Sequence, residues 1–202
     1  MSEIALPLFP LNTVLFPGGV LTLRIFEARY LDMVSACLKQ DSGFCVCLIR
    51  SGAEVGQAAD THEVGTLAKI TAWTQREDGL LGITCWGEQR FRIRSRVLMP
   101  NRLLTGDVEM LPDAPEQQVP TRLQMLVALF KELNERTGYL PPDMLQKATQ
   151  ANWLSYRLAE LLPVDLSEKQ MLLEVDDGLQ RLDLIATILG SARNHTAENT
   201  EE

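Results

Sequence analysis

The chain has 202 residues, 46% of them hydrophobic, and is therefore long enough to bury one large core or two modest ones. Its net charge of −8 is uneven: residues 1–110 carry 11 basic and 12 acidic side chains, whereas residues 111–202 carry 8 and 15. An acidic second half neutralises phosphates poorly, which disfavours nucleic acid as the main ligand. No apolar run is long enough to span a bilayer and no export leader is recognisable, so we expect a soluble, cytoplasmic protein.

The chain opens with two strand-like segments joined by a tight turn. Residues 6–11 form an extended apolar run with two prolines, which predicts an edge strand or a strand entry. The proline and glycines at residues 17–19 predict a chain reversal, because proline presets φ and glycine adopts positive φ without strain. Residues 20–26 are rich in β-forming side chains. The spacing after them predicts a helix whose core-facing residues are Leu31, Val34 and Leu38.

Strand signals also dominate the following segment. Residues 43–49 are continuously apolar, which predicts a strand buried on both faces. Residues 66–75 and 80–86 flank Asp78-Gly79, a pair typical of a type I′ hairpin turn. The register set by that turn pairs Trp73 with Thr84. It predicts a core face that consists of Ile70, Ala72, Ile83 and Cys85.

The same register makes Trp73 and Trp86 diagonal neighbours on the opposite face of the hairpin. Two interpretations of this pair stay open. It packs under another layer of the protein, which we favour, or it forms an exposed aromatic patch that grips a partner.

Beyond Gly87, arginines alternate with the apolar residues Phe91 and Ile93. The alternation predicts a strand whose outer face carries Arg90, Arg92, Arg94 and Arg96. We interpret this stripe as a solvated face that protects a sheet edge, because no aromatic residue is interleaved with it. A phosphate-binding stripe is the alternative.

The second half of the chain is helical in its spacing. Prolines at residues 112–116 mark a boundary, and Asp165 with Glu168 forms a capping-box-like helix start. Helix ends are predicted at Gly138, at Pro163 and just before Gly190. We therefore expect a β-rich lobe over residues 1–111, a helical bundle over 117–192 and a disordered acidic tail over 193–202.

The order of these motifs resembles the Lon protease amino-terminal (substrate-binding) domain in its stand-alone form, without ATPase or peptidase domains. The resemblance rests on the run LPLFPLNTVLFPGGVLTLRIFEARY at residues 6–30. It continues through residues 64–93 to residues 166–184. It implies an α+β fold, with a PUA-like β-barrel-type lobe that holds one helix and an all-helical bundle lobe after it.

Recognisable catalytic spacings are absent from the sequence. No P-loop, nucleophile elbow or zinc-hydrolase spacing occurs, and the four cysteines lie in apolar segments without a Cys-x-x-Cys pair. We therefore expect structural free thiols, no enzyme activity, no metal and no cofactor. The resemblance implies binding of unfolded or hydrophobic polypeptide segments, with an adaptor role for a protease or chaperone as one form of it.

The candidate binding residues lie at the entry of the first helix and on the hairpin: Phe26, Glu27, Arg29, Tyr30, Asp32, Trp73 and Trp86. Arg29 and Asp32 are expected off the core-facing side of the helix, on a rim that holds an extended client. A solvated first turn is the other interpretation of these charges. The alternative function is a PUA-like protein that binds RNA or a small molecule through the arginine stripe.

Overall fold

The protein is described by a computed structural model that covers residues 4–54, 59–75, 77 and 79–198. The chain divides into two compact units, Met1–Pro112 and Asp113–Glu202. The division falls in the proline-containing segment between the strand-rich and helical parts of the sequence. Among the described residues, no helix combines the length and the hydropathy that crossing a bilayer requires.

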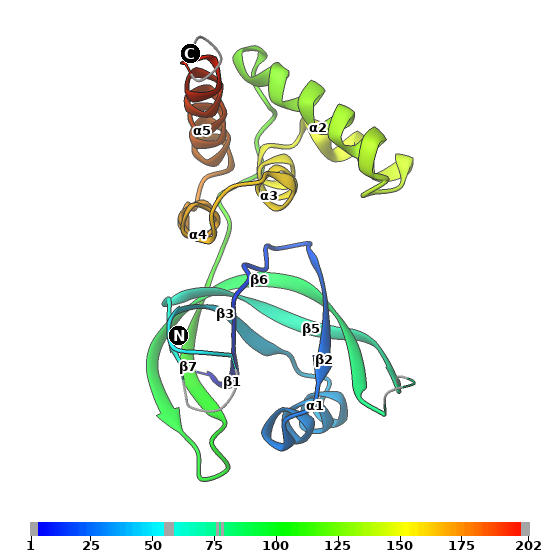
Figure 1. The fold of residues 1–202 in the computed structure, drawn as a ribbon, viewed down its shortest axis with the longest axis vertical. Coiled ribbons are helices and arrows are strands. Elements are labelled where there is room, and N and C mark those ends of the chain that lie inside the picture. The colour runs from blue at the N-terminus through cyan, green and yellow to red at the C-terminus, as the bar shows by residue number, and fades with distance from the viewer. Residues whose placement is uncertain (1–3, 55–58, 76, 78, 199–202) are drawn as a thin grey trace. The chain divides into compact units, whose positions relative to one another are not determined.

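The first unit is a seven-stranded mixed sheet with one helix (Figure 1). Its elements are β1 (Ile4–Leu11), β2 (Val20–Ile25), α1 (Ala28–Gln40), β3 (Phe44–Ser51), β4 (Asp60–Thr61), β5 (Val64–Gln75), β6 (Leu81–Leu98) and β7 (Leu104–Leu111). Neighbouring strands follow the order β1-β7-β6-β5-β3, and β1 also pairs with β3 in parallel. The hydrogen-bonded path therefore returns to its first strand, while β2 and β4 attach to it as side members.

The turn before β2 shows why its glycines are needed. The N–H of Gly19 donates to the Phe16 carbonyl at 2.9 Å, and Gly18 has a φ of +75°, which together describe a type II turn after Pro17. Gly18 donates to the carbonyl of Gly87, and Gly87 donates back to Gly19. A Cβ on Gly87 would lie 2.3 Å from the Phe16 carbonyl oxygen, so only glycine fits. The predicted chain reversal at residues 17–19 is confirmed.

The predicted register of the β5–β6 hairpin is wrong by one residue. Trp73 pairs with Ile83 instead of Thr84, so the register already differs by one residue at the turn end of the hairpin. Ala72 consequently pairs with Thr84 instead of Cys85 and is exposed, whereas Ile83 is buried as predicted. A bulge between Ile70 and Ala72 shifts the register by one further residue. Gly79 has the positive φ expected of the turn, and Asp78 lies outside the described residues.

Helix α1 turns a different face to the core from the one predicted. Its buried residues are Arg29, Tyr30, Met33, Val34 and Cys37. Leu31 and Leu38 are exposed, so their predicted burial is wrong, while that of Val34 is confirmed. Both stripes have helical spacing and share Val34. The stripe with the aromatic, methionine and thiol side chains packs into the core of this unit, which also includes Phe9, Phe44 and Ile83.

The second unit consists of helices: η1 (Thr121–Leu123), α2 (Gln124–Thr137), η2 (Pro142–Thr149), α3 (Ala151–Leu161), α4 (Leu166–Glu174) and α5 (Gly178–Glu198). The apolar side chains of its interior include Leu126, Phe130, Leu154, Leu158, Leu182 and Ile185. The capping box of Asp165 with Glu168 is confirmed, and so is the end of α2 at Gly138.

The last helix is longer than predicted. Gly190 lies inside α5 instead of just past its end. A lone glycine in a helix interior costs only about 1 kcal/mol, and no proline follows it to stop the helix. Residues 193–198 of the predicted tail therefore belong to α5, and residues 199–202 lie outside the described residues.

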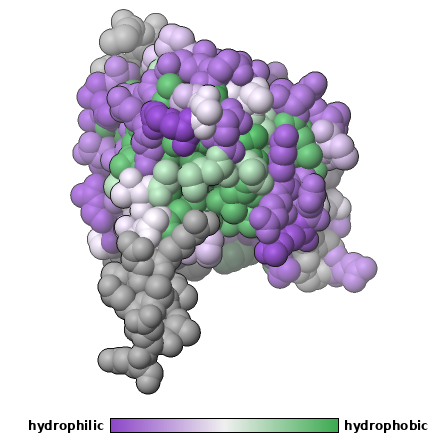
Figure 2. All heavy atoms as spheres, turned by 90° about the horizontal axis from the view of Figure 1, so that it is seen from above, coloured by the Kyte–Doolittle hydropathy of each residue, from purple (hydrophilic) through white to green (hydrophobic). Residues whose placement is uncertain are grey.

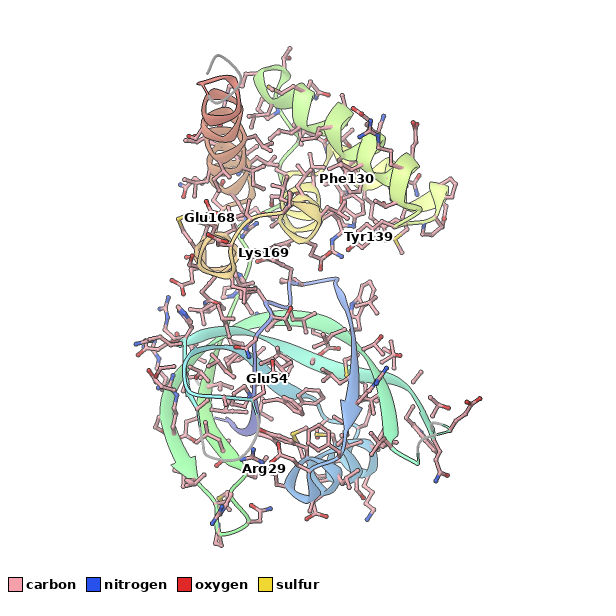
Figure 3. All side chains as sticks on the ribbon, viewed as in Figure 1. Arg29, Glu54, Phe130, Tyr139, Glu168 and Lys169 are labelled. Carbon is pink, nitrogen blue, oxygen red and sulfur yellow. The ribbon has the colours of Figure 1, made fainter. Side chains whose placement is uncertain are left out.

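A buried polar cluster joins the helices of the second unit. The Tyr139 hydroxyl donates to the Glu160 carboxylate, which also forms an ion pair of 2.9 Å with Arg157. Lys169 donates to the backbone carbonyl of Glu160 at 2.9 Å (Figure 3). Burial raises the pKa of Glu160 despite the nearby Arg157. The cluster thus ties α3 to α4 and to the segment after α2.

Candidate functional site

A pocket of about 180 Å³ opens in the first unit beside β2. One wall consists of six consecutive residues, Thr22 to Glu27. Side chains of successive strand residues point to opposite faces of a sheet, so a pocket that touches every one of them lies along the edge of the strand. The remaining lining residues are Phe9 and Leu11 of β1, Tyr30 of α1, and Glu54.

The inner wall of the pocket is apolar and built from packed aromatic rings. The rings of Phe9 and Tyr30 stack with centroids 4.0 Å apart and an angle of 21° between their planes. Phe9 also meets the ring of Phe44 at 5.6 Å. Burial raises the pKa of Tyr30 more than the nearby Arg29 lowers it, so its phenol stays neutral at pH 7. Phe26, which is 54% exposed, lines the same pocket from the end of β2.

The charged residues beside the pocket belong partly to the scaffold. The Arg29 guanidinium forms an ion pair of 2.8 Å with Glu27 and donates to the Arg102 carbonyl at 3.0 Å. Arg29 is only 8% exposed, so its predicted place on an exposed rim is wrong. The reason is that it lies one turn before Met33 on the buried face of α1. Figure 3 labels Arg29 and Glu54 in this unit.

The pocket brings together three of the seven predicted site residues: Phe26, Glu27 and Tyr30. Arg29 joins them through Glu27, whereas Asp32 is exposed on α1 and does not line the pocket. Seven lining residues were not predicted from the sequence: Phe9, Leu11, Thr22, Leu23, Arg24, Ile25 and Glu54. Residue types alone did not indicate them, because a strand edge is defined by which strands pair with it.

The two tryptophans are not neighbours. Trp73 pairs with Ile83, whereas Trp86 lies between Val20 of β2 and Lys69 of β5. They are 63% and 40% exposed, so the favoured interpretation that they pack under another layer is wrong. The partner of Trp73, Ile83, lies three residues from Trp86 in β6, which separates the two side chains. Trp86 forms an exposed apolar pair with Val20 on the outer face of the sheet, and neither tryptophan lines the pocket.

The predicted arginine stripe is interrupted. Arg90 is fully buried, and a register shift between Ile93 and Ser95 breaks the alternation of β6. Arg94 pairs with Glu109, and Arg96 donates to the Thr61 carbonyl at 3.1 Å. The prediction of one continuous outward-facing stripe is therefore wrong.

A second concave surface, of about 360 Å³, lies between α2 and α5 of the helical unit. Its lining is mostly apolar and consists of Met125, Leu126, Ala128, Leu129, Glu132, Ala186, Leu189 and Gly190. Figure 2, which looks onto this unit, shows hydrophobic residues gathered between hydrophilic ones.

The cysteines are structural thiols, as predicted. Cys37, Cys45, Cys47 and Cys85 are free and buried. Burial raises the pKa of Cys47 and of Cys85 to about 12, so both remain protonated near neutral pH. Among the described residues, no group of three or more histidine, cysteine or carboxylate side chains is placed to hold a metal ion.

The sequence is similar to one part of several proteases. It is 29% identical over 185 residues to the Lon protease of Cytophaga hutchinsonii and 27% identical over 192 residues to that of Xanthomonas oryzae. These alignments cover 87% and 91% of this chain. They cover only 23% and 22% of the proteases, so the chain spans under a quarter of their length.

Solved structures share the fold. A Lon N-terminal domain protein from Xanthomonas campestris superposes with a TM-score of 0.76 at 34% identity, over 91% of this chain and 98% of that one. The N-terminal domain of the Mycobacterium avium complex Lon protease has the same fold, with a TM-score of 0.64 at 20% identity over 90% and 95% of the two chains. The family model of the ATP-dependent protease La (LON) substrate-binding domain matches residues 5–191. The chain therefore belongs to the family of the Lon substrate-binding domain.

Proposed function

We propose that this chain is a non-enzymatic recognition module that binds exposed apolar stretches of unfolded polypeptide in the pocket beside β2. Membership of the substrate-binding family supports the class of ligand. The observation that carries the location is the pocket itself, which has an inner wall of apolar side chains and Phe26 exposed in its lining. An adaptor role toward a protease or a chaperone is the cellular setting that we propose.

The size of the pocket favours a side chain over a cofactor. A dry cavity of about 150 Å³ accommodates benzene, whereas pockets for drug-sized ligands measure about 300–1,000 Å³. The pocket beside β2, at about 180 Å³, matches one large apolar or aromatic side chain. A recognition module that reads one such side chain at a time would accept many unfolded sequences.

The polar groups at the pocket suit binding better than catalysis. The Glu27 carboxylate is engaged in an ion pair with Arg29, and the raised pKa of Tyr30 keeps its phenol neutral near pH 7, where it is no base. We also propose that the first unit is a PUA-like barrel, which the closed path of paired strands supports. The interrupted arginine stripe gives the RNA-binding alternative no support.

The proposal is tested by fluorescence polarisation with a permanently unfolded probe. The full chain is titrated into labelled α-lactalbumin that has been reduced and carboxymethylated, with the native, disulfide-intact form as the folded control. We expect saturable binding of the unfolded form alone. Equal binding of both forms, or of neither, would contradict the proposed function.

Two exposed apolar residues provide a matched pair of variants. Phe26→Ser should weaken binding of the unfolded probe about fivefold or more, which corresponds to about 1 kcal/mol. Met125→Ser changes a residue that is 57% exposed in the groove of the helical unit and should leave the affinity unchanged. The reverse pattern would move the site to the α2–α5 groove.

A further inference from the structure

We propose that β2 captures its client by strand addition, so that an extended client segment pairs with the outer edge of β2 and places one apolar side chain in the pocket. This inference rests on the proposed function and specifies the conformation of the ligand and its contacts. The juxtaposition that carries it is an unpaired strand edge that runs directly along an apolar pocket.

β2 has one partner strand. Among the described residues it pairs with β6 alone, from Val20 opposite Trp86 to Ile25 opposite Leu81. The backbone groups on its other side therefore form an open edge. A row of unpaired N–H and C=O groups is a template for an additional strand.

The register identifies the groups at this open edge. In an antiparallel pair, directly opposite residues alternate between those that exchange hydrogen bonds and those that do not. Gly87 donates to the Gly19 carbonyl, so hydrogen-bonded pairs follow at Leu21 and Leu23. The N–H and C=O groups of Thr22 and Arg24 consequently point away from β6, toward the open edge.

The pocket lies beside these same residues. Thr22 and Arg24 line it together with Leu23 and Ile25 between and after them. A strand paired with Thr22 and Arg24 would run about 4.8 Å from β2, with alternate side chains turned toward the inner and outer faces of the sheet. The inward side chain would meet the wall made by Phe9 and the other apolar lining residues. Its neighbours would face solvent, where most residue types are tolerated.

The edge carries little of the protection that proteins usually give to such strands. Proline, lysine and other charges on the edge, and bulges, are the common devices. β2 has no proline or lysine, its one charge is the exposed Arg24, and the bulge at Gly18 lies before the strand. An edge with a single charge remains able to accept another strand.

A second copy of the chain is a poor occupant. Its β2 would have to offer an apolar side chain, but Ile25 is buried in its own core and Leu21 and Leu23 pack against that core. Only Val20, Thr22 and Arg24 remain exposed. Thr22 and Arg24 are polar, and Val20, the one apolar residue among them, lies at the very start of the strand. The occupant is therefore a segment without a fold of its own, with apolar residues at alternate positions.

The test uses a labelled ten-residue peptide with a central phenylalanine and alternating valine and serine, titrated against the full chain. Single backbone N-methyl groups are placed at each position in turn. Strand addition predicts a period of two, with a loss of about tenfold where the peptide N–H faces β2 and less than about twofold at the positions between. A response without this period, while the unfolded protein probe still binds, would overturn strand addition and leave the proposed function standing. Absence of binding to any unfolded probe would overturn both.

A variant of the protein tests the same contact from the other side. Thr22→Pro removes an N–H that makes no bond to β6, whereas Thr22→Ala removes the side chain and keeps the N–H. Peptide affinity should fall about tenfold in Thr22→Pro and stay unchanged in Thr22→Ala. Equal affinities in the two folded variants would contradict the inference. Should Thr22→Pro fail to fold, the N-methyl series decides alone.

Discussion

At the scale of single residues, Arg29 belongs to the scaffold of the pocket and not to its binding surface. Its guanidinium is buried and holds both the Glu27 carboxylate and the Arg102 carbonyl. Those contacts connect the start of α1 to the segment between β6 and β7. The residue therefore acts by positioning the pocket lining and does not offer a free charge to a client.

The consequence is a loss of stability when Arg29 is removed. Arg29→Ala should lower the free energy of unfolding by about 1–3 kcal/mol, because a carboxylate and a carbonyl lose their donor. Asp32→Ala, at an exposed position on the same helix, should change it by less than about 0.5 kcal/mol. Urea denaturation of the two variants measures the difference. Equal midpoints would show that the Arg29 contacts are not formed in solution.

The raised pKa of Glu160 predicts how the stability of the protein depends on pH. Because burial raises its pKa in the folded protein above the ordinary value of 4.5, the folded state holds this proton more tightly than the unfolded state. The stability that Glu160 contributes is therefore complete below pH 4.5 and decreases as the pH rises through the folded pKa.

A comparison with Glu160→Gln isolates this effect. At low pH the protonated Glu160 carries no charge, so Glu160→Gln should change the stability by less than about 1 kcal/mol there. As the pH rises above 4.5, the native protein must bury a charge that the variant lacks, so its stability should fall relative to that of the variant. Chemical denaturation at several pH values measures the difference. A native protein that gains stability relative to the variant as the pH rises would mean that attraction to Arg157 outweighs burial.

At the scale of elements, the spacing of apolar residues does not determine which face of α1 is buried. Its leucines and its buried residues form two helical stripes that share Val34, and hydrophobicity alone favours the leucines. The choice depends on the surrounding core, where the ring of Phe9 stacks on Tyr30 and also meets Phe44. That information lies in other elements and not in the helix sequence.

A pair of alanine variants tests the orientation of this helix. Met33→Ala should cost about 2–5 kcal/mol of stability because it leaves a cavity in the core. Leu38→Ala, at a position 43% exposed, should cost less than about 1 kcal/mol. Thermal or urea denaturation compares them. A larger loss in Leu38→Ala would restore the orientation expected from the leucine spacing.

Other elements were predictable to different degrees for identifiable reasons. The turn at residues 17–19 and the capping box at Asp165 are local, since the residues that form them also determine their geometry. The register of β5 with β6 is not local: Trp73 pairs with Ile83, which lies three residues from Trp86 in β6, and a bulge between Ile70 and Ala72 shifts the register further. Phe26, Glu27 and Tyr30 of the pocket were predictable from the sequence, but the open edge of β2 was not, because that edge depends on strand pairing.

At the scale of the whole molecule, the chain combines a strand-rich unit with an accessible edge and a helical unit with a polar buried cluster. The family relationship extends over both units, from residue 5 to residue 191. We propose that an unfolded polypeptide binds along β2. The backbone groups at the outer edge of this strand would then be open in the free protein and covered in the complex.

Amide hydrogen exchange measured by NMR at single residues of β2 tests this claim most directly. In the free chain, the amides of Thr22 and Arg24 should exchange fast, whereas those of Leu21 and Leu23, which bond to β6, should exchange slowly. Saturation with reduced and carboxymethylated α-lactalbumin should slow the Thr22 and Arg24 amides by about tenfold or more. Unchanged exchange at both amides under saturation, with new protection only between α2 and α5, would contradict the account.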